Sequence, residues 1–116
     1  NAEDMYKFAK AVFIDYSLIS ENSLNQILNS FFFSESGKHA SSSGSIHRQD
    51  IDFFGDSIIA YGHSGGDIGY SSNLTYIPTY NTILVINYNY GTQFSSLIGE
   101  EITNLKKEIY FEAISH

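Results

Sequence analysis

The sequence predicts an α+β fold, in which helices at both ends of the chain cover an antiparallel three-stranded meander. Apolar residues recur at helical spacing near both termini, whereas residues 57–87 alternate with the shorter period of β-strands. The chain has 116 residues, of which 42% are hydrophobic and 16% charged, so it can bury one core. We therefore expect residues 1–116 to form a single domain or a fragment of one.

Two helices are expected before the sheet. Residues 3–14 place apolar side chains on one helical face, and Glu3 and Asp4 in the first turn suit the helix dipole. A second helix is expected from Ser20 to Ser30, with Ser20 as its N-cap. The apolar face of the first helix consists of Met5, Phe8, Ala9, Val12 and Phe13, and that of the second of Leu24, Ile27, Leu28 and Phe31.

The middle of the chain is less regular. Residues 34–45 are rich in Ser and Gly and are expected to form a loop. Residues 46–55 combine aspartates with isolated apolar residues, which fits either a short strand or an ordered loop.

Three strands and a last helix are expected after residue 57. The strands cover residues 58–64, 70–77 and 82–87, with a turn or bulge at 65–69 and a hairpin turn at 78–81. The third strand is apolar on both faces and should be buried on both sides. The last helix is expected over residues 95–111, with an apolar stripe of Phe94, Ile98, Ile102, Leu105 and Ile109.

Composition excludes several classes of function. A net charge of −7 gives no electrostatic attraction to nucleic acid or to an anionic membrane surface. No apolar run approaches the roughly 18 residues of a membrane-spanning helix. The chain has no Cys, so thiol chemistry and disulfides are excluded. The spacing of its four histidines and of the aspartates matches no zinc pattern, and we expect neither a metal nor a cofactor.

Residues 61–72 carry the chemistry-bearing side chains. Their sequence, Tyr-Gly-His-Ser-Gly-Gly-Asp-Ile-Gly-Tyr-Ser-Ser, joins a titratable ring and hydroxyls to glycines that leave the backbone accessible. These groups could bind an anion or an oxyanion. A triad of Ser64, His63 and Asp67 is not expected, because neighbouring strand residues point to opposite faces.

This stretch resembles the third motif of the serine β-lactamase and penicillin-binding protein superfamily. The motif is Lys or His, then Thr or Ser, then Gly, followed by Gly-Phe/Tyr-Ser-Ser, and it is closest to the class C-like branch of DD-carboxypeptidases, esterases and D-aminopeptidases. Residues 2–9 resemble a helix of that branch, and residues 77–78 and 83–87 resemble its next two strands. The resemblance covers nearly the whole chain except residues 34–54.

The resemblance implies a role for four neighbouring residues. His63 would line the substrate pocket and help to hold a substrate carboxylate, and Ser64 would direct its hydroxyl to that carboxylate. Gly65 would let the substrate lie along the strand edge. The backbone N–H of Gly66 would be one of two oxyanion donors.

The nucleophile of that superfamily is absent from this sequence. It is the Ser of Ser-x-x-Lys, and no such tetrapeptide occurs here. The resemblance therefore implies the C-terminal part of a bacterial, periplasmic or secreted hydrolase that acts on β-lactams, D-amino-acid peptides or esters. Such a chain would be inactive without the N-terminal part of the same protein.

A non-catalytic role is the alternative. The chain would then keep only the fold, as a binding or self-assembly module. The strand Thr82–Asn87 would expose an apolar edge that pairs with a second copy.

Overall fold

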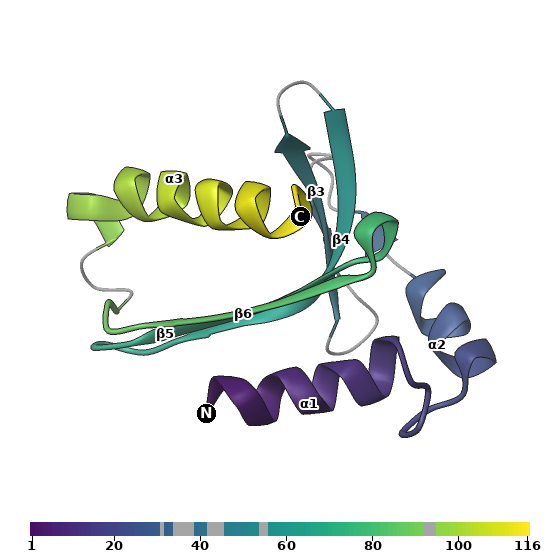
Figure 1. The fold of residues 1–116 in the computed structure, drawn as a ribbon. Coiled ribbons are helices and arrows are strands. Elements are labelled where there is room, and N and C mark those ends of the chain that lie inside the picture. Colours follow the sequence, from purple (N-terminus) through teal and green to yellow (C-terminus); the bar gives the residue numbers. More distant parts are fainter. Residues whose placement is uncertain (31, 34–38, 42–45, 54–55, 92–94) are drawn as a thin grey trace.

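The computed structural model describes residues 1–30, 32–33, 39–41, 46–53, 56–91 and 95–116. Over these residues the chain forms three α-helices and one antiparallel sheet whose six strands follow one another in sequence order (Figure 1). The helices are α1 (Ala2–Phe13), α2 (Glu21–Leu28) and α3 (Ser95–Ile114). The strands are β1 (Phe32–Phe33), β2 (His39–Ser41), β3 (His47–Phe53), β4 (Asp56–Gly66), β5 (Ser71–Ile77) and β6 (Thr82–Tyr88).

The predicted α+β class is confirmed, but the sheet is wider than the predicted three-stranded meander. Residues 46–55, for which strand and loop were both open, contain β3, and β2 lies inside the predicted loop 34–45. The sequences of β2 and β3 do not indicate a strand clearly, because they are mostly polar. The preference of a residue for a strand also depends on the neighbours against which it packs. The loop prediction is therefore wrong at residues 39–41, and the rest of that loop lies outside the described residues.

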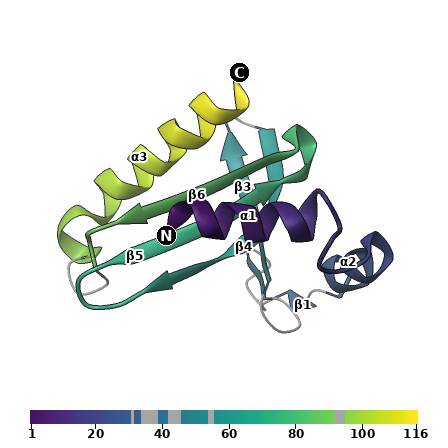
Figure 2. The same ribbon diagram turned by 60° about the horizontal axis from the view of Figure 1, so that its bottom comes forward.

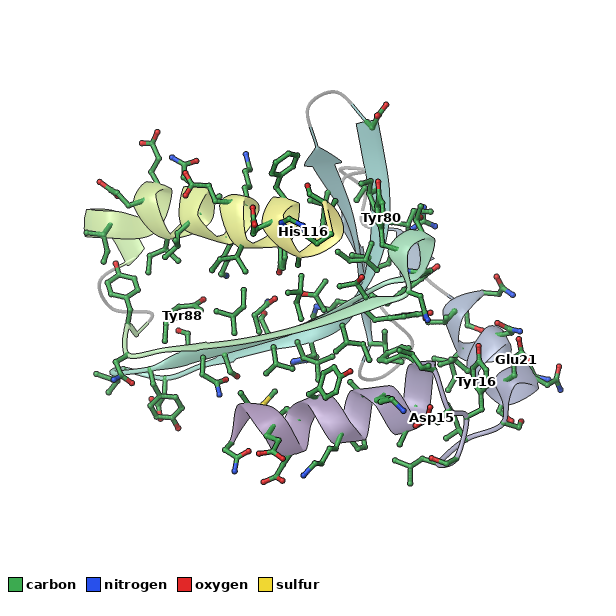
Figure 3. All side chains as sticks on the ribbon, viewed as in Figure 1. Asp15, Tyr16, Glu21, Tyr80, Tyr88 and His116 are labelled. Atoms are coloured by element: carbon green, nitrogen blue, oxygen red, sulfur yellow. The ribbon has the colours of Figure 1, made fainter. Side chains whose placement is uncertain are left out.

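Helices α1 and α3 cover opposite faces of the sheet. Figure 1 shows α3 above the β5–β6 layer and α1 below it, and Figure 2 shows both helices running across that layer. Helices cover both faces of β6, since Ile83 packs on the α1 side and Leu84 and Ile86 pack on the α3 side. These side chains are only half-buried, so the predicted burial of β6 on both sides is confirmed in part. Figure 3 shows Tyr88 on the α3 side, and Lys106 lies over its ring, 5.2 Å from the centroid.

The core on the α1 side joins both N-terminal helices to the sheet. Phe13 stacks on Tyr76 with ring centroids 4.8 Å apart, and Leu24 of α2 is buried in the same cluster. Phe8 was expected in this core, but it is 59% exposed. It precedes the buried Ala9 by one residue, about 100° of helix rotation, which places it at the margin of the buried face.

The core on the α3 side differs from the predicted stripe. Tyr110 is buried there with Ile58, Ala60 and Ile77. The prediction is wrong for Ile98 and Leu105, which are 41% and 54% exposed, whereas Ile102 and Ile109 are half-buried. The backbone of Ile98 is not helical (φ −132°, ψ 20°), so the helical phase is interrupted near the start of α3. Phe94 lies outside the described residues.

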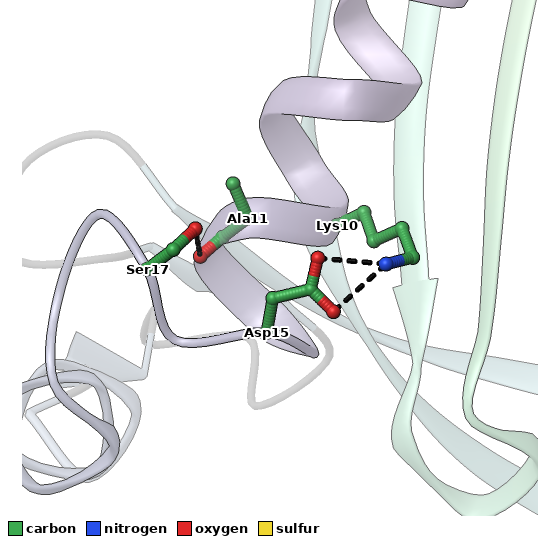
Figure 4. Close-up of polar contacts among 4 residues, drawn as sticks. All are labelled: Lys10, Ala11, Asp15 and Ser17. Atoms are coloured by element: carbon green, nitrogen blue, oxygen red, sulfur yellow. Dashed lines mark hydrogen bonds and ion pairs between the residues drawn. The ribbon is translucent and has the colours of Figure 1, made fainter.

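A compact turn links α1 to α2. Lys10 Nζ donates to both carboxylate oxygens of Asp15, at 2.8 and 2.7 Å, and Ser17 Oγ donates to the Ala11 carbonyl (Figure 4). The hydrogen bond to Asp15 raises the pKa of Lys10. Tyr16 takes a left-handed conformation with φ 52°, which reverses the chain. The predicted N-cap of α2 is confirmed, because Ser20 Oγ accepts from the backbone N–H of Ser23 at 3.2 Å.

Candidate functional site

The motif residues 63–66 are the last four residues of β4. Strand β3 pairs with β4 from His47 opposite Gly62 to Phe53 opposite Asp56. Strand β5 pairs with β4 as far as Gly66 opposite Ser71. Among the strands that the structure describes, residues 63–66 therefore pair with β5 alone. Their other side extends beyond the start of β3.

The phase of the β4–β5 ladder sets the direction of the backbone groups. The N–H of Asp67 donates to the carbonyl of Tyr70 at 2.9 Å across a two-residue turn. Antiparallel ladders alternate between hydrogen-bonded and non-hydrogen-bonded pairs. Counting back from this bond, the Gly66 and Ser64 positions are non-hydrogen-bonded pairs, so their N–H and C=O groups point away from β5. An oxyanion donor at Gly66 needs its N–H on the side of β4 that faces away from β5, which is where this N–H points. The donor role itself stays a prediction.

His63 and Ser64 lie on opposite faces of the sheet. His63 is opposite Leu74, which packs against the α1-side core, whereas Ser64 is opposite Asn73, which bonds to α3. This placement agrees with the expectation that the two side chains do not form a triad with Asp67. The Asp67 carboxylate accepts from the N–H of Ile68 at 2.7 Å instead.

The His63 side of the edge borders a groove under α1. The imidazole ring of His63 contacts that of His47 on β3, with ring centroids 4.6 Å apart and ring planes tilted by 57°. The groove has a volume of about 670 Å³ and is mainly apolar. Besides His63 and Gly65 it is lined by Phe8 and Leu74, among other residues. An apolar cavity of this size beside a few polar groups has the usual character of a small-molecule site.

Two glycines set the shape of the strand edge. A Cβ at Gly62 would collide with the carbonyl oxygen of Leu74, so β4 and β5 approach closely only because this residue has no side chain. A Cβ at Gly91 would collide with the carbonyl of Ile68. Gly91 thus lets the segment after β6 pack on the turn that ends the site, where Ser71 Oγ also donates to the Tyr90 carbonyl at 2.7 Å. A Cβ at Gly65, by contrast, would meet only Ser72 Oγ at 3.4 Å.

A buried polar cluster behind Ser64 was not predicted. Asn73, Thr75 and Tyr110 are 8%, 3% and 6% exposed. Asn73 Oδ1 accepts from the Thr75 hydroxyl and from the Tyr110 hydroxyl, at 2.8 Å each, and the two hydroxyl oxygens are 3.0 Å apart. The period of a strand places Asn73 and Thr75 on one face, but nothing in the sequence identifies Tyr110, 37 residues from Asn73, as their partner.

The described residues contain no group of three or more His, Cys, Asp or Glu side chains suited to a metal ion. In the same part of the chain, no helix combines the length and apolar character needed to cross a membrane. Searches of protein-family models, curated proteins and solved structures found no match to this chain.

Proposed function

We propose that this chain is the C-terminal segment of a β-lactamase-like serine hydrolase, in which the end of β4 forms one wall of the active site. The chemistry is acyl transfer on a β-lactam, a D-amino-acid peptide or an ester. The Ser64 hydroxyl binds the substrate's carboxylate, His63 lines the substrate pocket from the opposite face of β4, and Gly65 lets the substrate lie along β4. The N–H of Gly66 stabilises the oxyanion. The nucleophile and its base belong to the N-terminal part of the same protein.

One observation supports this proposal most directly. The four motif residues lie where β4 continues past β3, and the backbone groups of Ser64 and Gly66 point away from β5. An extended ligand can pair with such an edge, and an N–H group there needs no rearrangement to meet a developing negative charge. The groove of about 670 Å³ beside His63 offers space for the rest of an acyl substrate.

The first test is the activity of the isolated chain. We expect no turnover of nitrocefin or of an acyl ester, because the sequence has no Ser-x-x-Lys and the remaining groups supply only residual catalysis. Clear turnover that His63→Ala abolishes would contradict this expectation.

The second test uses the longer protein encoded by this chain together with the region upstream of Asn1. We expect that region to contain Ser-x-x-Lys and the longer protein to turn over one of the three substrate classes. There, Gly66→Pro should lower kcat/KM by about 100- to 1,000-fold, because it removes one oxyanion donor. Gly66→Ala is the matched control, since it keeps the N–H. An upstream region without Ser-x-x-Lys, or equal activity of both variants, would refute the proposed role.

A second candidate function is self-assembly through β6. This strand is the last in the described sheet and pairs only with β5, while α1 and α3 cover its two faces. An edge strand of this kind can pair with a second copy of the chain. The oligomeric state in solution distinguishes this function from the first one.

A further inference from the structure

We propose that Asn73 is a positioning residue for Ser64: its carboxamide NH₂ group, through one water molecule, holds the Ser64 hydroxyl at the edge of β4. The use of that hydroxyl in substrate binding rests on the proposed function. The ordering of Ser64 is a property of this chain and can be measured without any activity.

The polar cluster fixes the orientation of the Asn73 carboxamide. Its Oδ1 is held by the hydroxyls of Thr75 and Tyr110, at 2.8 Å each, so its NH₂ group points away from them. That NH₂ group donates to no described residue, although Asn73 is only 8% exposed. This donor is not among the side-chain atoms that are fully closed off from solvent without a partner, so water can reach it and complete its hydrogen bonding.

Asn73 and Ser64 both line one small cavity. Its volume is about 20 Å³, and its lining includes Asn73, Thr75, Gly62 and Ser64. One water requires roughly 10–15 Å³ and two to four polar neighbours. Three of the lining residues, Asn73, Ser64 and Thr75, carry the polar groups that such a water needs.

Ser64 is within reach of this water. It is opposite Asn73 in a non-hydrogen-bonded pair, where Cβ atoms of facing residues lie about 4.5–5.5 Å apart. The Ser64 side chain is exposed, so without a partner its hydroxyl would sample several rotamers. The bridging water selects one Ser64 rotamer. Because Tyr110 of α3 donates to Asn73, the same water links the position of α3 to the edge of β4.

The test measures the χ1 rotamer of Ser64 by NMR three-bond couplings in the full chain. We expect one dominant rotamer in the native protein and averaging in Asn73→Leu, which keeps the packing but has no NH₂. Tyr110→Phe should shift the Asn73 side-chain NH₂ resonances. Tyr88→Phe is the matched control, because Tyr88 also lies on the α3 side, and it should leave both signals unchanged. A rotamer of Ser64 that is already averaged in the native protein, or is unaffected by Asn73→Leu, would overturn the proposal.

A high-resolution crystal structure of the native chain decides the question if Asn73→Leu does not fold. A water within hydrogen-bond distance of both Asn73 Nδ2 and Ser64 Oγ supports the proposal, and its absence overturns it. Neither readout depends on hydrolysis. A failed activity test of the longer protein would therefore remove the proposed function and leave the ordering of Ser64 to be judged separately.

Discussion

Gly62 lets the backbone of β5 approach β4 closely in the candidate site, and its substitution gives a prediction at the scale of one residue. In Gly62→Ala the new Cβ would collide with the Leu74 carbonyl oxygen, which is backbone and cannot rotate away. We expect this variant to lose about 1–3 kcal/mol of unfolding free energy, as is typical when atoms are forced into a filled space. Urea unfolding measures the difference.

Gly69→Ala is the control for this substitution. Gly69 lies in the turn after β4, and its Cβ would have no heavy atom within 4 Å. Its unfolding free energy should stay within about 0.5 kcal/mol of the native value, as for most surface changes. Equal losses in the two variants would show that glycine at position 62 is not required by the approach of β5.

Tyr76 gives a second prediction, which concerns alkaline pH. Burial raises the pKa of Tyr76 above its usual value of 10.0, and nearby Tyr16 raises it further. The folded chain therefore keeps this proton more tightly than the unfolded chain. The resulting stability is fully present below pH 10 and is lost as pH rises through the folded-state pKa.

We expect the unfolding free energy of the native chain to fall above pH 10, and the slope to be shallower in Tyr76→Phe. Denaturant titrations at a series of alkaline pH values measure both slopes. Tyr80→Phe, at an exposed position on the same hairpin, is the control and should keep the native slope. A native slope in Tyr76→Phe would show that another group causes the alkaline loss.

At the scale of elements, local signals determined what could be predicted. The apolar periods predicted the three helices and most of strands β4, β5 and β6, and Ser20 is the N-cap as predicted. The turn predicted over residues 65–69 is wrong at Gly65 and Gly66, which continue β4. Strand β3 could not be predicted firmly, because Arg48, Asp50 and Asp52 give it a polar sequence and its conformation depends on pairing with β4 over seven residues. A strand whose conformation depends on its neighbour gives little signal in its own sequence.

In the candidate site, too, some features follow from the local sequence and others depend on contacts between separate elements. Strand alternation alone separates His63 from Ser64, and the structure places them on opposite faces as expected. The contact of His47 with His63 depends on the register of β3, and the bond from Tyr110 to Asn73 depends on how α3 lies across the sheet. These contacts join segments that no short motif connects, so only the folded structure reveals them.

At the scale of the whole molecule, two helical layers enclose the sheet but leave one long strand at its edge. Residues 82–88 of β6 pair with β5 on one side only among the described strands. In an edge strand, alternate N–H groups have no strand partner and exchange readily with solvent. The apolar side chains of β6 are already packed against α1 and α3, so pairing with a second copy would mainly add backbone hydrogen bonds.

We therefore predict that alternate amides of β6 exchange more slowly as protein concentration rises. Hydrogen exchange followed by NMR at low and high concentration measures this effect, with light scattering on the same samples. The amides of β5 are the internal control, because β4 and β6 pair with β5 on both sides and its exchange should not depend on concentration. A monodisperse monomer at high concentration, with β6 exchange unchanged, would exclude self-assembly through this edge. The edge would then remain available for the N-terminal part of the proposed hydrolase.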